Sequence, residues 1–411
     1  MSTPILVLNC GSSSIKFAVF DGDTDSLPRA PLWAGKVDGI GSNAKLVQGR
    51  AEPVALDLDP AKPYHAALQY VRTSVEEQAQ GRLPSAVAHR VVHGGTKYAA
   101  PVRVDKEVLA ELKSYIPLAP LHQPYALEAI EILLAEVPQV PQIACFDTAF
   151  HRTLPEVEQM LPLPYAQWER GVRRYGFHGL SYEYMTIALA ERHGAAARGR
   201  TIVAHLGSGA SLCAMQDLQS VATTMGFSAL DGLMMGTRCG SLDPGVLLHL
   251  LESQKLDVKQ LAHVLYHESG LLGVSGISAS PKDLLDLEGT SVRARAALDL
   301  YVRRVVREIG ALTAVLGGLD MLAFTAGVGE HSALLRARIC SALAWLGVRT
   351  DEDANRANAS TISDARSRVR VAVEPTNEEW IAASHAVREL RKGARGTTRS
   401  RAPAIPEGSD A

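Results

Sequence analysis

The sequence predicts an α/β protein made of two similar domains, and three observations support this fold class. At 411 residues the chain is too long for a single hydrophobic core. Apolar segments with the lengths of strands and of helices alternate along it, as they do in layered α/β folds. A pattern of strand, glycine-rich turn and strand occurs near residue 10 and again near residue 207, which indicates an internal duplication.

The first copy of this pattern lies at the start of the chain. The apolar run Ile5–Leu8 leads into the turn Asn9–Lys16, and a second apolar run with an acidic end, Phe17–Asp21, follows, which is typical of a β-hairpin. Small residues in a tight turn expose backbone N–H groups and hydroxyls that suit phosphate oxygens, and Lys16 adds a positive charge. A polar turn without a ligand explains the same residues, so this segment alone leaves both interpretations open.

The second copy begins at Thr201. The apolar run Thr201–His205 enters the turn Leu206–Ser211, and another apolar run, Leu212–Met215, follows. Gly207 takes the place that Gly11 has in the first copy. Two such domains facing each other would bring the turns together across a cleft, where they could hold a polyphosphate. Chance similarity between two glycine hairpins is the alternative, and their equivalent placement in comparable segments argues against it.

The remaining elements follow from apolar periodicity and turn residues. We predict helices at residues 64–79, 123–136, 180–193 and 292–316, and strands at 86–92, 143–146, 321–325 and 369–373. The helix 292–316 has the clearest pattern, because apolar residues from Leu298 to Leu316 recur at spacings of three and four before Gly317. Few large apolar side chains occur from Gly393 onward, so a disordered tail is expected at 393–411.

The composition is that of an ordinary globular protein and excludes several classes. A net charge of −2 gives no electrostatic footprint for nucleic acid. The 5 cysteines are scattered without CxxC spacing, so neither a disulfide framework nor a zinc site is expected, and a reducing compartment fits. No apolar run reaches the roughly 18 residues of a membrane helix, and no signal peptide is evident. We therefore expect a cytoplasmic protein that does not contact a membrane.

Candidate functional residues occur where predicted strands end and where glycine is frequent. Asp147 ends the strand 143–146, the position at which α/β proteins bind ligands. Capping of the next segment is its alternative role. Arg90 and Arg238 each lie beside glycine-rich sequence, where a guanidinium suits a carboxylate or a phosphoryl group through paired hydrogen bonds. A surface ion pair is the alternative for either arginine alone.

Two histidines and two short segments are further candidates. His178 lies among basic, aromatic and glycine residues and His122 lies between prolines, but a hydrogen-bonded packing role explains either one. The segment Gly327–His331 follows a strand and precedes a helix predicted to begin near Ser332, which suits a phosphate or nucleotide edge. The carboxylates of Pro375–Glu379 could hold Mg²⁺ or cap the following helix.

Taken together, these segments resemble the acetate kinase family, within the superfamily of actin, sugar kinases and chaperone ATPases. The resemblance covers about residues 4–390 and depends on six motifs that occur in order. They are Asn9–Lys16, His89–Gly95, Phe146–His151, Tyr175–Gly179, Met235–Gly240 and Pro375–Glu379. It implies duplicated ribonuclease H-like domains of the actin and sugar-kinase type flanking a cleft, and a homodimer. The N-terminal domain would be 1–148, joined by the C-terminal helix 376–392, and the nucleotide-binding domain would be 149–375.

The resemblance implies reversible phosphoryl transfer between ATP and acetate, giving ADP and acetyl phosphate, with Mg²⁺ as the metal and Mn²⁺ as an alternative. Arg90 and Arg238 would then hold the carboxylate and the passing phosphoryl group, and His178 would stabilise the transition state. Asp147 would transfer a proton or orient the metal or an arginine. Because acetate is already an anion and needs no base, the orienting role is favoured.

The resemblance also assigns substrate, metal and nucleotide contacts. His122 would approach the phosphoryl group, and the acyl pocket would be lined by Val92, Leu121 and Phe177. The metal would be bound or oriented by Asn9 and Glu378. The nucleotide would contact Lys16, His205, Leu206, Gly207, Ser208, Gly209, Ser280, Pro281, Lys282, Gly327, Val328, Gly329, Glu330 and His331.

Four positions depart from the family pattern. The family usually has Asn at Ser208 and at His331, Pro at Ala229, and an Asp-aromatic (or Met)-Arg triplet at Ser280–Lys282. That triplet holds the ribose and adenine, so the phosphoryl donor stays open, pyrophosphate included. Propionate kinase is the alternative within the class, and a non-catalytic ATP-binding protein of the superfamily is the alternative outside it. The presence of Arg90, Asp147, His178, Arg238 and Glu378 argues against the latter, because a pure binder has no need of both arginines.

Overall fold

The computed structural model describes residues 4–22, 26–49, 51–120 and 122–399, with side chains as far as residue 392. The chain separates into two compact units, which we call unit 1 (Met1–Phe146 with Glu379–Ala411) and unit 2 (Asp147–Glu378). The domain limits expected from the sequence, at residues 148 and 375, lie two and three residues from these limits.

Each unit alternates strands and helices, as expected. Unit 1 contains β1 (Pro4–Cys10), β2 (Ser14–Asp21), β3 (Trp33–Asp38), β4 (Lys45–Val47), β5 (Val54–Ala55), α1 (Pro63–Gln78), β6 (Ala86–Val91), β7 (Val102–Val104), α2 (Lys106–Ser114), η1 (Ile116–Leu118), α3 (Gln123–Glu136), β8 (Gln142–Phe146) and nearly all of α15 (Glu378–Arg399). Unit 2 contains η2 (Ala149–Thr153), α4 (Glu156–Gln159), α5 (Tyr165–Glu169), α6 (Gly179–His193), η3 (Gly194–Arg198), β9 (Thr201–Leu206), β10 (Ala210–Gln216), β11 (Gln219–Thr223), α7 (Pro244–Glu252), α8 (Val258–His267), α9 (Gly270–Ser275), α10 (Pro281–Leu287), α11 (Val292–Leu316), β12 (Met321–Thr325), α12 (Ala326–His331), α13 (Ala333–Ala342), η4 (Ala344–Leu346), α14 (Glu352–Arg356) and β13 (Arg370–Val373).

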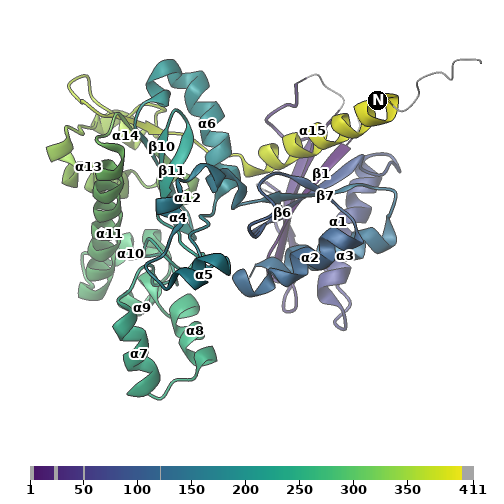
Figure 1. Ribbon diagram of the computed structural model, residues 1–411, viewed down its shortest axis with the longest axis horizontal. Helices are drawn as coiled ribbons and strands as arrows, with labels where there is room; N and C mark the ends of the chain where they lie inside the picture. The colour runs from purple at the N-terminus through teal and green to yellow at the C-terminus, as the bar shows by residue number, and fades with distance from the viewer. Residues whose placement is uncertain (1–3, 23–25, 50, 121, 400–411) are drawn as a thin grey trace, which may run out of the picture. The chain divides into compact units, whose positions relative to one another are not determined.

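Both units contain the same five-stranded arrangement, which supports the inferred duplication (Figure 1). In unit 1 the order is β3-β2-β1-β6-β8, with β1 to β3 antiparallel and with β6 and β8 parallel to β1. In unit 2 the order is β11-β10-β9-β12-β13, with the same directions. Unit 1 adds β4 and β5 at one edge and β7 at the other. The predicted hairpins are β1–β2 and β9–β10, the first two strands of each copy.

Apolar helix faces build the core of unit 1. α1 begins at Pro63, whose fixed φ suits a first helical position. Its buried side chains, Leu68 and Val71 among them, join a cluster with Leu6 and Leu8 of β1 and with side chains of α3. These β1 residues are two apart in the sequence and therefore lie on the same face of the sheet. Burial of each such side chain is worth about 1.5–3 kcal/mol.

After the last parallel strand of each copy the chain passes into the other unit. The helices from η2 to α6, which come after β8, form part of unit 2, and nearly all of α15, which comes after β13, lies in unit 1. There Trp380 Nε1 donates to Leu27 O (3.0 Å). α15 continues to Arg399, so residues 393–399 are helical and the expected disorder of 393–411 is wrong for them. Extending a helix that has begun avoids the nucleation cost. Residues 400–411 lie outside the described part.

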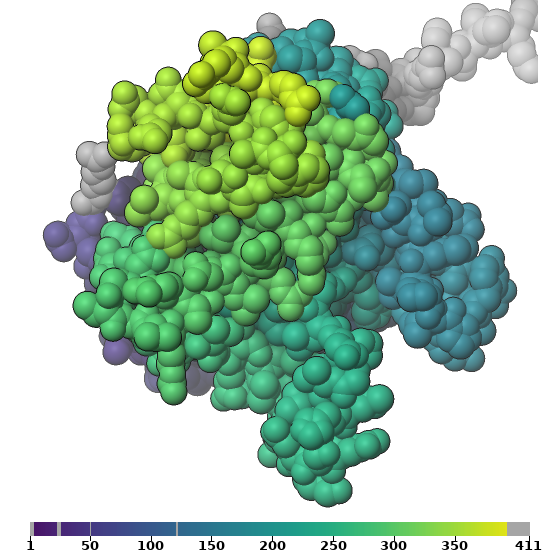
Figure 2. Space-filling view, turned by 90° about the vertical axis from the view of Figure 1, so that its left-hand side faces the viewer, coloured from purple at the N-terminus to yellow at the C-terminus, as the bar shows by residue number. Residues whose placement is uncertain are grey.

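The other predicted elements are confirmed to within a residue at each end. α11 spans the predicted 25 residues; Ser291 Oγ accepts a hydrogen bond from Ala294 N at its start, and Gly317 ends it at φ +68°. Leu298 and Ile309 of its predicted stripe are buried. α7 and α8 project from the remainder of unit 2 as a lobe (Figure 2). Within the described ranges, no helix combines the length and the apolar character that crossing a membrane requires.

Candidate active site

The motif Gly176–Gly179 forms the sharp turn that begins α6. His178 is the N-cap residue of α6 and has a left-handed backbone, with φ 58° and ψ 26°. The Gly179 N–H donates to Asp147 O (2.9 Å), and a Cβ at position 179 would lie 2.1 Å from that oxygen. Only glycine therefore fits there. The turn brings the backbone of Asp147, which follows β8, to the residue after His178.

His178 is held in a short chain of buried polar groups. Its ring stacks on the ring of His205, with centroids 4.1 Å apart and planes inclined by 14°. Its Nδ1 lies 2.8 Å from Ser211 Oγ, and the same oxygen lies 2.6 Å from the hydroxyl of Tyr182. Sequence reasoning assigned no role to Ser211, which ends the predicted turn, or to Tyr182, which stands in no motif. Only the fold brings β10 and α6 together around the imidazole.

Buried polar groups need hydrogen-bond partners, and this requirement decides which group donates and which accepts at each step. Burial raises the pKa of Tyr182 well above its usual value, so the phenol keeps its proton. In the described part of the chain, Ser211 Oγ is the hydrogen-bond partner of that hydroxyl, and a buried O–H must donate. Tyr182 therefore donates to Ser211, and the single Ser211 hydrogen goes to Nδ1 of His178. This assignment leaves the hydrogen of the neutral imidazole on Nε2.

The β9–β10 turn lies directly in front of that nitrogen. The Gly207 N–H donates to Gly209 O (3.1 Å). A Cβ at Gly209 would lie 3.2 Å from His178 Nε2 and 3.5 Å from Arg238 Nη1. A glycine turn, the imidazole of His178 and the guanidinium of Arg238 thus lie close together in unit 2. Donors and positive charge concentrated in this way suit phosphate oxygens.

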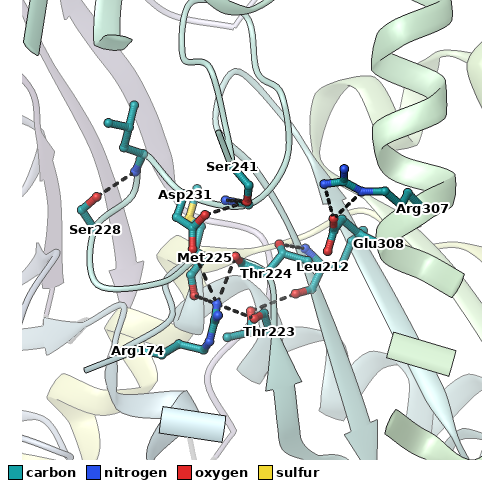
Figure 3. A network of polar contacts seen from close by, with 12 residues as sticks. Arg174, Leu212, Thr223, Thr224, Met225, Ser228, Asp231, Ser241, Arg307 and Glu308 are labelled. Carbon is teal, nitrogen blue, oxygen red and sulfur yellow. Dashed lines mark hydrogen bonds and ion pairs between the residues drawn. The ribbon is translucent and has the colours of Figure 1, made fainter. Parts of the chain in front are cut away.

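A second arginine anchors the loop that carries Arg238 (Figure 3). The Arg174 Nη1 lies 3.1, 3.2 and 3.1 Å from the carbonyl oxygens of Thr223, Thr224 and Met225, and 3.8 Å from an Asp231 carboxylate oxygen. The loop between β11 and α7 is therefore fixed where it leaves the sheet. Arg174 stands in the Tyr175–Gly179 region of the sequence, but its role required the carbonyls of another element.

The same loop is closed by further polar contacts. Ser241 Oγ donates to Asp231 Oδ1 (2.6 Å) and accepts from Gly232 N (3.2 Å). Arg238 Nη1 donates to the carbonyl of Ala229 (3.1 Å). Residue 229, where the family pattern has Pro, therefore lies beside the guanidinium, and its carbonyl helps to orient it.

The predicted nucleotide segment Ser280–Lys282 lies next to this loop. A Cβ at Gly236 would meet Ala279 O at 3.0 Å. Ser280 is the N-cap of α10, and its hydroxyl accepts from Asp283 N (3.4 Å). The hydroxyl hydrogen remains available to donate. Lys282 is exposed at the start of α10.

The segment Gly327–His331 corrects one expectation. It was predicted as a glycine turn before a helix starting near Ser332, but it is itself helical, because α12 begins at Ala326 directly after β12. Ala326 takes the left-handed conformation (φ +64°) that joins strand to helix. The glycines Gly327 and Gly329 are therefore positions of a short helix, and α13 follows after Ser332.

A buried arginine that sequence reasoning missed fixes the end of α12. All five N–H groups of Arg336 donate to neutral acceptors. These are Asn355 Oδ1 (2.9 Å), Gly329 O (2.8 Å), Glu330 O (2.9 Å), Asn355 O (2.7 Å) and Asn358 Oδ1 (2.6 Å). Burial lowers the pKa of Arg336. No pattern in the sequence marks it, since a single arginine in a helix is usually exposed.

Hydroxyl groups connect the nucleotide side with the segment before α15. His205 Nδ1 lies 2.8 Å from Ser181 Oγ, which lies 2.9 Å from Thr376 Oγ1. Glu330 Oε1 accepts from Thr376 N (3.1 Å). Thr376 is thereby fixed two residues before Glu378, the predicted metal ligand. Among the described residues no group of three or more His, Cys, Asp or Glu forms a metal cluster. A single carboxylate such as that of Glu378 fits Mg²⁺, which keeps several waters and takes phosphate ligands.

The predicted residues of unit 1 lie at the ends of its strands. Asn9 is near the end of β1, Lys16 is exposed on β2, and Arg90 is paired in register with Cys145 of β8. Val92 is half-buried just after β6, and His122 is the N-cap of α3. These positions follow the hairpin and strand ends that the sequence indicated.

One glutamine holds the segment after β6 in place. Gln123 Oε1 accepts from His93 N (3.1 Å), and its Nε2 donates to His93 O (2.9 Å). Gln123 thus binds both backbone groups of the residue next to Val92, a role the sequence did not reveal. In unit 2, Phe177 is buried and its carbonyl bonds to His151 Nε2 (2.9 Å). Leu121, the third predicted acyl-pocket residue, lies outside the described residues.

Comparison with known proteins identifies the family. The model of the acetokinase family matches residues 4–384. Acetate kinase of Rhodopseudomonas palustris is 48% identical over 397 residues, covering 94% of this chain and 98% of the relative. Acetate kinase of Rhizobium meliloti is 45% identical over 388 residues, covering 93% and 97%.

Solved structures agree with this comparison. Porphyromonas gingivalis acetate kinase has a TM-score of 0.84 at 35% identity, covering 95% of this chain and 100% of that one. A propionate kinase from Francisella tularensis has a TM-score of 0.86 at 34% identity, covering 94% and 99%. The duplicated sheets have the actin and sugar-kinase fold, and the family match defines a phosphotransferase. The chain belongs to the acetokinase family.

Proposed function

We propose that this protein is a carboxylate kinase that transfers the γ-phosphoryl group of ATP to acetate, reversibly, giving acetyl phosphate and ADP. Membership of the acetokinase family supports the activity. The observation that carries the residue assignment is the convergence of Gly209, His178 Nε2 and Arg238 Nη1 in unit 2. Phosphoryl transfer depends on positioning and charge stabilisation more than on covalent catalysis, and these groups provide both.

Each residue has a defined task in this scheme. An acetate oxygen attacks the γ-phosphorus while the bond to the β-phosphate oxygen breaks, so no proton has to be removed from acetate. Arg238 and the Nε2–H of His178 donate to the oxygens of the transferring group, where negative charge is concentrated. The backbone of Gly207–Gly209 binds the donor phosphates. Arg90 holds the carboxylate through paired hydrogen bonds.

A divalent metal completes the proposed site. Asn9 and Glu378 would hold Mg²⁺ or Mn²⁺ through oxygen ligands, and the ion would neutralise charge on the phosphates. The buried Asp147 is assigned an orienting role toward the metal or an arginine, as the anionic acetate requires no general base. The remaining nucleotide contacts, Ser280–Lys282 and Gly327–His331, are proposed from their places beside the arginine loop and after β12.

Propionate is the second candidate acceptor, and position 229 favours it. A propionate kinase is among the similar solved structures. Ala229 lies beside Arg238 and lacks the ring carbons of the usual Pro. Hydrophobic pockets discriminate one methylene by only about 1–3 kcal/mol. We therefore expect measurable propionate use, and a narrower preference for acetate in Ala229→Pro.

The decisive experiment is a hydroxamate assay of acyl phosphate formation. Acetate, propionate and butyrate are each combined with ATP, GTP and pyrophosphate. We expect the highest kcat/KM with acetate and ATP, and a loss of about 10² or more in kcat for Arg238→Ala with its melting temperature retained. The control Arg307→Ala changes the same charge at an exposed residue of α11 and should behave as wild type. Absence of acetyl hydroxamate in wild type contradicts the proposal.

We also propose a homodimer. Unit 2 exposes large apolar side chains, including Val157 (77%), Tyr165 (63%) and Leu248 (58%). Exposed apolar area of this kind often marks an interaction surface. Light scattering measures the mass directly, and a mass of 44.0 kDa, that of a single chain, contradicts the dimer.

A further inference from the structure

A cavity of about 790 Å³ opens in unit 2, away from the candidate active site. It is lined by the end of α6 (Arg192, His193), by Asp320 before β12, and by the segment that enters β13 (Asp364, Arg368, Arg370). Its size is that of pockets which bind small molecules. No residue of the proposed catalytic machinery lines it.

The pocket and the unit 2 residues of the candidate site lie at opposite ends of the parallel strands of one sheet. β9, β12 and β13 are parallel, and Met321 is in register with both Thr201 and Arg370. The pocket is formed where these strands begin, whereas His205 and Thr325 lie near their carboxyl ends. At about 3.3 Å per residue, a strand of five residues places its two ends roughly 15 Å apart. A ligand in the pocket is therefore distinct from the substrates.

The acidic residues of the pocket wall already have cationic partners. Arg200 binds Asp320 through Nε (2.9 Å) and Nη2 (2.6 Å). Asp364 lies 3.6 Å from Arg366 Nη2 and accepts from the Arg366 N–H (2.7 Å). On the cationic side, Arg192 is paired with Glu374 (2.6 Å). The acidic groups of this wall are thus neutralised locally.

Arg368 and Arg370, two further arginines of the pocket wall, differ from these paired residues. Within the described part of the chain, the guanidinium groups of Arg368 and Arg370 make no hydrogen bond or ion pair, although both line the pocket. His193 Nε2 is buried and makes no hydrogen bond within that part either. Burial, Arg370 and Arg192 lower the pKa of His193, with Glu374 opposing them. A neutral imidazole and two guanidinium groups thus face one cavity without an acceptor.

We propose that this pocket binds a small molecule carrying two or more negatively charged oxygens, held by Arg368 and Arg370 with His193 Nε2 as a third donor. Two guanidinium groups supply paired N–H donors that match phosphate or carboxylate oxygens. The hydroxyls of Thr361 and Ser363 line the same cavity and add donors. This inference does not depend on the proposed activity, because it uses none of the catalytic residues.

Isothermal titration calorimetry at pH 7 tests the site with two probes, pyrophosphate for a phosphate source and tricarballylate for a carboxylate source. To remove any binding of pyrophosphate at the proposed phosphate-binding site, Arg238→Ala is titrated alongside wild type and should retain the pocket's binding. In Arg368→Gln/Arg370→Gln the Kd of the pocket should rise at least about tenfold, as expected for losing hydrogen bonds to charged groups. His193→Gln should weaken binding to a smaller extent.

A matched double variant controls for net charge. Arg307→Gln/Arg356→Gln removes the same two charges from exposed positions outside the pocket and should leave the Kd unchanged. Hydroxamate activity reports that the pocket variants and the charge control are folded, and the melting temperature reports the same for Arg238→Ala. Binding of either probe that needs Arg368 and Arg370 supports the site and identifies the ligand source. The proposal is overturned if neither probe binds in Arg238→Ala, or if the pocket double variant binds as tightly as wild type.

Discussion

At the scale of residues, a serine decides which nitrogen of His178 carries the hydrogen. The hydroxyl of Tyr182 donates to Ser211 Oγ, and Ser211 has one hydrogen. While the tyrosine is present, that hydrogen therefore goes to Nδ1 of His178. The orientation of His178 in the proposed site thus depends on two residues that have no proposed substrate contact. Ser280 has a similar double role, because it caps α10 while its hydroxyl hydrogen remains available for a ribose.

We expect Ser211→Ala to lower kcat by about tenfold or more, because the imidazole loses the bond that orients it and fixes its tautomer. Tyr182→Phe should lower kcat less, since Ser211 can still donate. The KM for ATP should change little, the pH profile of kcat should shift, and Ser211→Thr should restore activity. Steady-state kinetics between pH 6 and 9 measures these effects.

Ser220→Ala is the matched control for Ser211→Ala. Ser220 bonds to His151, a neighbouring buried histidine outside the proposed chemistry. This variant should lose stability but keep its kcat. If Ser211→Ala and Ser220→Ala have the same kinetic profile, the positioning role of Ser211 is wrong.

Ser280→Asp should tighten ATP binding. A carboxylate bonds ribose hydroxyls more strongly than a neutral hydroxyl does, by about 1 kcal/mol or about fivefold in KM. Asp is as good an N-cap as Ser, so α10 should remain intact. Ser291→Asp, the same exchange at the N-cap of α11, controls for added charge. An unchanged KM for ATP in Ser280→Asp would show that residue 280 does not take part in nucleotide recognition.

At the scale of elements, short segments near the site are positioned by side chains from elsewhere. α12 has only six residues, too few to be stable alone. Its last carbonyls are bound by Arg336 of α13, which also binds the α14 region through Asn355. The arginine loop depends in the same way on Arg174 (Figure 3). Arginine side chains therefore fix the backbone at two places near the β9–β10 turn.

Arg336→Leu should destabilise the protein by about 3 kcal/mol or more, because it leaves five acceptors without this donor, three of them in buried hydrogen bonds. Activity should fall as well, since Glu330 loses its fixed position. Urea unfolding and hydroxamate activity measure the two effects. Arg356→Leu is the control, an exposed arginine whose ion pairs are worth at most about 1 kcal/mol. Equal unfolding free energies for the two variants would contradict this role of Arg336.

At the scale of the whole molecule, the chain is two copies of one sheet topology, each completed by a helix that follows the other copy's strands. This exchange makes both units depend on segments distant in the sequence. Each unit also buries neutral histidines. Burial lowers the pKa of His89, His93 and His151 to about 4. These groups couple stability to pH in both units.

We expect the melting temperature to fall between pH 7.5 and pH 5. The three histidines are neutral when folded but take up protons below about 6.5 once the chain unfolds, so their contribution is complete above that pH and is lost as pH falls toward 4. At pH 5 each should cost about 2 kcal/mol. Scanning calorimetry at pH 7.5, 6 and 5 measures the trend. Equal melting temperatures at pH 7.5 and pH 5 would show that the histidines are not buried as neutral groups.

The sequence by itself determined the elements and the duplication. Apolar periodicity located α3, α11 and β12, and the two glycine turns marked the repeated hairpins, because these signals are local and depend on residue spacing. Motif resemblance identified the family and the catalytic candidates His178 and Arg238. Tail disorder at residues 393–399 and a glycine turn at Gly327–His331 were wrong, since a helix once begun continues through residues with weak local preference.

Only the tertiary structure decided how the site is held. Ser211, Tyr182, Arg174, Gln123 and Arg336 carry no sequence signal, because a hydrogen-bond partner is defined by distance in space and these partners lie on other elements. The donor and acceptor roles of Tyr182, Ser211 and His178 follow from their burial, which cannot be read from the sequence. The pocket at Arg368 and Arg370 likewise exists only where three segments, distant along the chain, meet at the start of parallel strands.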